Sequence, residues 1–220
     1  MISQNYLWRR WTLNCGLAEF FGIGLAAMIA LLHREIMGEP QLTSEYIINM
    51  LFMLVAGLIE GTIVGYFQWR VLKLKFGAIP KSRWIFLTAF GAVIAWFLGM
   101  LPSMFLSQSS SKSMPTDVTP PLVVIVLLGG MMGAALGALW GGIQWVELRK
   151  HVKWAKQWIW ANTLGWFVGL AIIMLAATLP NDSTPWQTIV MLGVSSGLLA
   201  GISVGAITGW FLIRLEPNCK

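Results

Sequence analysis

Six long apolar segments constrain this chain most, because a helix needs about 20 consecutive apolar residues to cross the hydrocarbon core of a membrane. These segments span residues 11–32, 46–69, 84–106, 121–145, 157–179 and 187–213. Hydrophobic residues make up 57% of the sequence and charged residues only 11%, whereas a water-soluble domain carries about 25% charged residues. The sequence therefore predicts an all-α integral membrane protein, with residues 1–220 forming one six-span domain.

Lys and Arg residues collect on one side of the predicted membrane. Thirteen of the fifteen lie on the side of both termini, and only Arg34 and Lys112 lie on the other. Because cytoplasmic loops are enriched in Lys and Arg, we expect both termini in the cytoplasm. Cys15 and Cys219 would then face a reducing compartment, so no disulfide is expected.

Two short basic loops, 70–83 and 146–158, follow the second and fourth spans. Such loops are attracted to the anionic inner leaflet, which makes membrane lipids the expected partners. The positive-inside distribution already accounts for the net charge of +6, so nucleic acid is not an expected partner. The residues expected to face lipid are Lys73, Lys75, Lys81, Arg83, Arg149, Lys150, Lys153 and Lys156.

Nine of the thirteen tryptophans fall near the predicted cytoplasmic ends of spans. An indole is apolar with one N–H donor, which suits the membrane interface. The sequence thus predicts an anchoring belt, and binding of a pigment or ligand is the alternative. The nine are Trp8, Trp11, Trp69, Trp84, Trp145, Trp154, Trp158, Trp160 and Trp210.

A phrase of Gly, three residues, Gly, two residues and Gln-Trp occurs twice, as "GTIVGYFQW" (61–69) and "GALWGGIQW" (137–145). It belongs to runs in which glycine recurs at every fourth position of the even-numbered spans. Residues four apart share a helix face, and without side chains a neighbouring backbone can approach closely. We expect glycine-zipper packing of these three spans near the centre of the bundle, with a glycine-lined pore as the alternative. The glycines are Gly57, Gly61, Gly65, Gly133, Gly137, Gly141, Gly197, Gly201 and Gly205.

The runs also indicate an internal repeat. Segments 10–16, 85–91 and 159–165 each open an odd-numbered span and end in Gly. The chain is therefore interpreted as three two-helix units in parallel orientation, roughly 1–77, 78–152 and 153–220.

Three polar residues occupy corresponding positions near the inner boundary of the even-numbered spans: Gln68, Gln144 and Thr208. Buried amides there predict hydrogen bonds between helices, worth about 0.6 kcal/mol each. The alternative is a ring of polar groups at a cytoplasmic gate.

Glu19 and Glu60 lie deep inside the first and second spans, eight and nine residues inward from Trp11 and Trp69. At about 1.5 Å per residue, both should lie roughly 12–14 Å from the tryptophans, where two antiparallel helices could bring them together. Two carboxylates without a cation cannot both be ionised cheaply. The pair is a candidate proton or cation site, and a neutral Glu bonded to a carbonyl is the alternative.

The sequence has no Ser-His-Asp set, phosphate loop or Cys/His cluster, and His33 and His151 each stand alone. We therefore expect no enzymatic activity, no catalytic residue, no metal site and no cofactor.

The Gln-Trp phrase with its basic flank, followed by "WIWANTLGW" (158–166), resembles a group of uncharacterised multi-spanning bacterial proteins of cyanobacterial type. The resemblance covers about 57–100 and 133–170 and implies a bacterial inner or thylakoid membrane, but no activity. Two functions are consistent with the sequence. One is a non-enzymatic accessory or assembly subunit of a larger membrane complex, which other membrane subunits would contact. The other is a small proton or cation permease or channel that uses Glu19 and Glu60.

Overall fold

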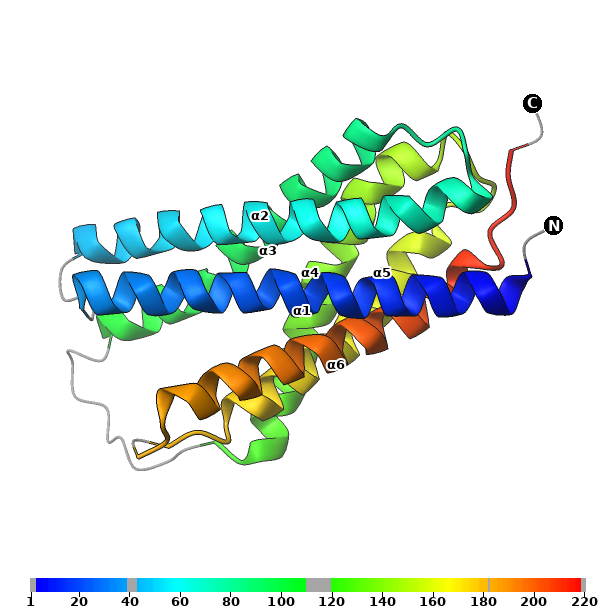
Figure 1. Ribbon diagram of the computed structural model, residues 1–220. Helices are drawn as coiled ribbons and strands as arrows, with labels where there is room; N and C mark the ends of the chain where they lie inside the picture. The colour runs from blue at the N-terminus through cyan, green and yellow to red at the C-terminus, as the bar shows by residue number, and fades with distance from the viewer. Residues whose placement is uncertain (1–2, 39–42, 110–119, 182, 219–220) are drawn as a thin grey trace.

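The computed structural model describes residues 3–38, 43–109, 120–181 and 183–218, and its described residues form six long helices (Figure 1). Two sequence predictions involve residues outside these ranges: the absence of a disulfide, through Cys219, and the sides of the membrane assigned to Lys112 and Lys220. The helices are α1 (Gln4–Met37), α2 (Thr43–Lys75), α3 (Lys81–Ser109), α4 (Leu122–Leu148), α5 (Gln157–Ala177) and α6 (Trp186–Leu212).

All six helices are long and apolar enough to cross a membrane, which confirms the predicted six-span architecture. The start of α1 and the tail after α6 lie at the same end of the bundle (Figure 1). There the Trp8 indole N–H donates to the Ala206 carbonyl at 2.9 Å. We call this the terminal end.

The helices form a closed ring in chain order. Among the described residues, each helix packs against its two neighbours along the chain, and α6 packs against α1. No two even-numbered helices pack backbone to backbone in the part of the chain that the structure describes, so the prediction that the three glycine-rich spans meet at the centre is wrong. A glycine ridge specifies that a helix can be approached closely, but it does not specify which helix approaches.

The glycine ridges instead face the next helix in the ring. A Cβ added at Gly61 of α2 would lie 2.5 Å from Ala92 Cβ of α3. One added at Gly137 of α4 would overlap the Asn162 carbonyl of α5, and one at Gly205 of α6 would lie 2.9 Å from Thr12 Cα of α1. The close backbone contacts are therefore α2–α3, α4–α5 and α6–α1, each joining helices that the sequence interpretation assigns to different two-helix units.

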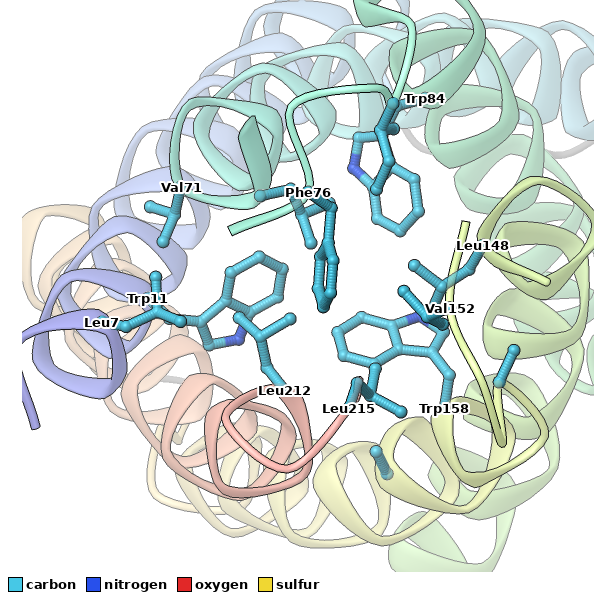
Figure 2. Packing of buried hydrophobic residues seen from close by; sticks show 14 of the residues in the cluster. Leu7, Trp11, Val71, Phe76, Trp84, Leu148, Val152, Trp158, Leu212 and Leu215 are labelled. Carbon is cyan, nitrogen blue, oxygen red and sulfur yellow. The ribbon is translucent and has the colours of Figure 1, made fainter. Parts of the chain in front are cut away.

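Large apolar side chains fill the axis of the ring at the terminal end (Figure 2). Each odd-numbered helix contributes one fully buried tryptophan and each even-numbered helix one fully buried leucine. The Trp158 ring meets the rings of Trp11 and Trp84 edge to face, with centroids 5.6 and 6.3 Å apart. We name this cluster the terminal plug; it comprises Trp11, Trp84, Trp158, Leu72, Leu148 and Leu212.

The plug corrects the prediction of a nine-residue tryptophan belt. Trp11, Trp84 and Trp158 are 0% exposed and cannot anchor the bundle in the interface. An indole fits a core as well as an interface, and its position near a span end does not distinguish the two. Trp154, Trp160 and Trp210 are exposed, as a belt requires.

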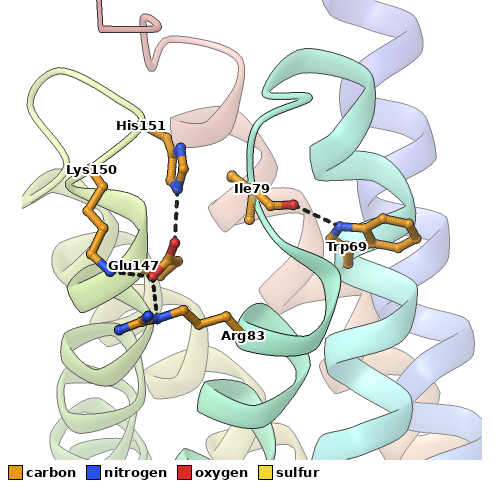
Figure 3. Close-up of polar contacts among 6 residues, drawn as sticks. All are labelled: Trp69, Ile79, Arg83, Glu147, Lys150 and His151. Atoms are coloured by element: carbon orange, nitrogen blue, oxygen red, sulfur yellow. Dashed lines mark hydrogen bonds and ion pairs between the residues drawn. The ribbon is translucent and has the colours of Figure 1, made fainter.

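An ionic cluster around the buried Glu147 ties the loops together (Figure 3). One carboxylate oxygen lies 2.8 Å from Arg83 Nε and 2.7 Å from Lys150 Nζ, and the other lies 2.9 Å from His151 Nε2. Lys75 Nζ donates to the carbonyls of Leu212 and Ile213 at the end of α6. Thus Lys75, Arg83 and Lys150, expected to face lipid, also hold helix ends together.

Candidate functional site

Glu19 of α1 and Glu60 of α2 lie near the middle of their helices and are almost fully buried, at 3% and 4% exposure. Because α1 and α2 run antiparallel and pack side by side, the two carboxyl groups reach the same depth. The structure brings them together: the Glu19 carboxyl is hydrogen-bonded to the Glu60 carboxyl.

Trp96 of α3 completes the group. Its indole N–H donates a hydrogen bond to Glu60 Oε2. Oε2 of Glu19, by contrast, is buried without a hydrogen-bond partner. The two carboxyls therefore have unequal surroundings, because Glu60 receives an external donor and Glu19 does not.

Three glycines make room for these three side chains. A Cβ on Gly22 would lie 2.7 Å from Glu60 Cγ, and one on Gly201 would lie 2.6 Å from Glu19 Cγ. A Cβ on Gly57 would lie 2.5 Å from Cδ1 of Trp96. Gly57 and Gly201 belong to the predicted ridges, so those ridges seat polar side chains as well as bringing backbones together.

The carboxyl pair has no positive side chain beside it within the described part of the chain. Among the described residues no Lys or Arg is buried, and the buried His33 lies against the Phe52 ring, 4.7 Å between centroids, near the opposite end of α1. The same residues contain no group of three or more His, Cys, Asp and Glu side chains that could hold a metal ion. A hydrogen bond between two carboxyl groups needs a hydrogen on one of them, so this arrangement suits a proton shared by the pair.

A polar chain continues from the pair toward the terminal end. The Cys15 thiol, one helical turn from Glu19, lies next to the Gln68 side chain. Gln144 Nε2 then donates to Gln68 Oε1 at 2.9 Å and to Thr88 Oγ1 at 3.0 Å. Oε1 of Gln144 accepts from the indole N–H of Trp158 at 2.8 Å, which joins the chain to the terminal plug.

The predicted polar ring is only partly assembled. Gln68 and Gln144 are directly hydrogen-bonded across the axis. Thr208 is buried at the same end, but its hydroxyl accepts from the Trp11 indole at 2.8 Å and donates to the Val204 carbonyl. These contacts connect helices in the manner expected of buried polar residues.

The two tryptophans of the repeated phrase, Trp69 and Trp145, do not share the hydrogen bonds of the neighbouring glutamines. The Trp69 indole N–H donates to the Ile79 carbonyl of the following loop at 3.1 Å (Figure 3). Trp145 instead lies under the Arg149 guanidinium, 4.6 Å from the ring centroid.

Sequence reasoning missed Trp96, Cys15 and Thr88 as parts of this site. One signal could have found Trp96: it lies in the interior of a predicted span, far from either boundary, where an indole N–H needs a buried partner.

Two cavities lie away from the carboxyl pair. One of about 500 Å³ lies between α2 and α3, and one of about 190 Å³ lies between α1 and α2 at the terminal end. Neither is bordered by Glu19 or Glu60. In comparisons with known proteins, no family model, curated protein or solved structure matches the chain.

Proposed function

We propose that the protein handles protons within the membrane, with Glu19 and Glu60 as the proton-binding pair. The observation that supports this best is the hydrogen bond between two buried carboxyls, with no buried Lys or Arg among the residues that the structure describes. Ionisable groups inside a membrane are costly and typically mark ion pathways or proton relays. A shared proton removes one of two like charges and so makes the pair tolerable there.

The surroundings favour a proton over a metal ion. Metal cations such as Ca²⁺ take six to eight oxygen ligands, whereas this site has two carboxyls and an indole N–H that points its hydrogen at one of them. A donor in that position repels a cation but stabilises a carboxylate. The roles follow: Glu60 accepts hydrogen bonds from Trp96 and Glu19, and Glu19 carries the shared proton.

Proton flux into proteoliposomes, read with an enclosed pH-sensitive dye, tests this function. Glu60→Gln should abolish the flux, because it removes the carboxyl that the Trp96 N–H stabilises as an anion. Glu19→Gln should reduce it, and the exposed Glu35→Gln on the same helix should leave it unchanged. Unchanged flux in both buried variants, or no wild-type flux above that of protein-free liposomes, would remove the proposal.

A second candidate function is that of a non-enzymatic accessory or assembly subunit of a larger membrane complex. The terminal plug favours a subunit over a transporter, because its six fully buried apolar side chains close the axis between the carboxyl pair and the terminal end. Purification in mild detergent distinguishes the candidates. Stoichiometric membrane-protein partners would favour a subunit, and a lone monomer would count against it.

For both candidates we propose a bacterial inner or thylakoid membrane with the terminal end on the cytoplasmic side. The distribution of Lys and Arg supports this orientation.

A further inference from the structure

The cavity between α1 and α2 at the terminal end is lined by three cations. Arg10 and Asn14 are one turn apart on α1, while Arg70 and Lys73 lie on the last turns of α2. Val71 and Leu74 provide the apolar part of the wall, and no acidic side chain borders the cavity. We name this cavity the basic pocket; its lining residues are Arg10, Asn14, Arg70, Val71, Lys73 and Leu74.

Neighbouring aromatic rings hold these cations without neutralising them. The Arg10 guanidinium lies over the Tyr6 ring at 5.3 Å, and the Lys73 ammonium lies over the Trp69 ring at 4.6 Å. Arg70 lies in the same way 6.0 Å from the Tyr66 centroid. None of the three forms an ion pair with an acidic side chain among the described residues, in contrast to Arg83 and Lys150 around Glu147. Their charge is therefore available to an external anion.

The volume and the polar groups of the pocket suit a phosphate. About 190 Å³ is many times the 10–15 Å³ or so that a single water needs. Two guanidinium groups can each donate paired N–H bonds to phosphate oxygens, and an ammonium adds a point charge. Asn14 uses one amide hydrogen on the Arg10 carbonyl at 2.7 Å, which leaves the other for the ligand.

The surface beside the pocket is apolar in the direction of the membrane core. Leu17 and Phe21 follow Arg10 and Asn14 along one face of α1, and both are exposed. The face thus changes from cationic to apolar over two helical turns, as expected where a phospholipid headgroup and its acyl chains lie against a protein.

From these contacts we propose that the basic pocket binds the phosphate headgroup of an anionic glycerophospholipid, with its acyl chains along the Leu17–Phe21 face. This inference does not depend on the proton-handling function, because the pocket and the carboxyl pair share no residue.

The experiment measures phosphatidylglycerol binding to the purified protein in neutral detergent by native mass spectrometry. Arg70→Gln and Arg10→Gln should each weaken binding about fivefold, which corresponds to about 1 kcal/mol per cation near a membrane surface. Lys73→Gln should act in the same direction. Arg149→Gln is the matched control, because Arg149 is also a terminal-end arginine held over an aromatic ring but lies outside the pocket. Thermal unfolding of each variant checks that the bundle is intact.

Three results would overturn the proposal. They are equal binding of the zwitterionic phosphatidylcholine, equal weakening by Arg149→Gln, and equally tight binding of soluble glycerol phosphate or inorganic phosphate. The last result would mean that the ligand is a free phosphate compound and not a lipid.

Discussion

Replacing Gly137 by Ala should destabilise the protein, because this glycine lies where the backbones of α4 and α5 are in close contact. An added Cβ would overlap the Asn162 carbonyl oxygen and lie 2.8 Å from Trp166 Cβ. A carbonyl oxygen and a Cβ are fixed by the backbone of α5, so the helices themselves must separate. Overpacking of this kind costs about 1–3 kcal/mol.

The opposing effect is helix propensity, which favours Ala over Gly by up to about 1 kcal/mol. Gly142→Ala on the same helix measures the propensity effect alone, since a Cβ at Gly142 would meet nothing within 4 Å. Both variants gain the same propensity term, so it cancels in the comparison. We expect Gly137→Ala to be less stable than Gly142→Ala by about 1–3 kcal/mol, a difference of roughly 5- to 150-fold in the folding equilibrium.

Reversible unfolding in mixed detergent micelles measures the two free energies. A second matched pair lies on α6: Gly205, where a Cβ would lie 2.7 Å from Cys15 Cβ, and Gly193, which has nothing within 4 Å. The packing account would be refuted if both pairs differed by less than about 0.5 kcal/mol, the range of ordinary surface substitutions.

Three further outcomes are expected. Trp96→Phe removes the N–H donor to Glu60 and should lower the unfolding free energy by about 1–2 kcal/mol more than Trp140→Phe does. Trp140 is the control because its buried indole N–H has no hydrogen-bond partner. Equal losses in the two variants would show that the Trp96–Glu60 hydrogen bond contributes nothing. Glu147→Gln should lower the unfolding free energy by about 1–3 kcal/mol at low salt, because Arg83 and Lys150 lose the carboxylate that pairs with both of them. An unchanged unfolding midpoint would count against that contribution. Alkaline phosphatase fused after the last residue should be inactive in bacterial cells if the terminal end is cytoplasmic, and an active fusion would reverse the orientation.

The spans could be predicted from sequence because length and hydropathy alone set them. The depth of Glu19 and Glu60 followed from counting residues along two antiparallel helices. The partner of each glycine ridge could not be predicted, since Gly61 is compatible with any neighbouring backbone. Trp96 could not be assigned to Glu60 either, because nothing in the sequence indicates which span lies next to the pair.

The three-unit repeat stays a prediction, but the alignment of its first unit needs correction. When the three opening segments are aligned on their final glycines, Trp11 corresponds to Phe86 and Trp160, which are 66% and 65% exposed. When the segments are aligned on their fully buried tryptophans, Trp11 corresponds to Trp84 and Trp158, at spacings of 73 and 74 residues. A glycine can stand at any close contact, whereas a buried tryptophan needs a specific volume, which makes it the better marker of equivalent positions.

The shared proton is tested most directly by infrared spectroscopy of the protein in lipid at neutral pH. The wild-type protein should show the carbonyl stretch of a protonated carboxyl group. The double variant Glu19→Gln/Glu60→Gln should remove that band, because it removes both carboxyl groups that can hold the proton. A wild-type spectrum without the band, or a band that is unchanged in the double variant, would contradict a proton held between Glu19 and Glu60.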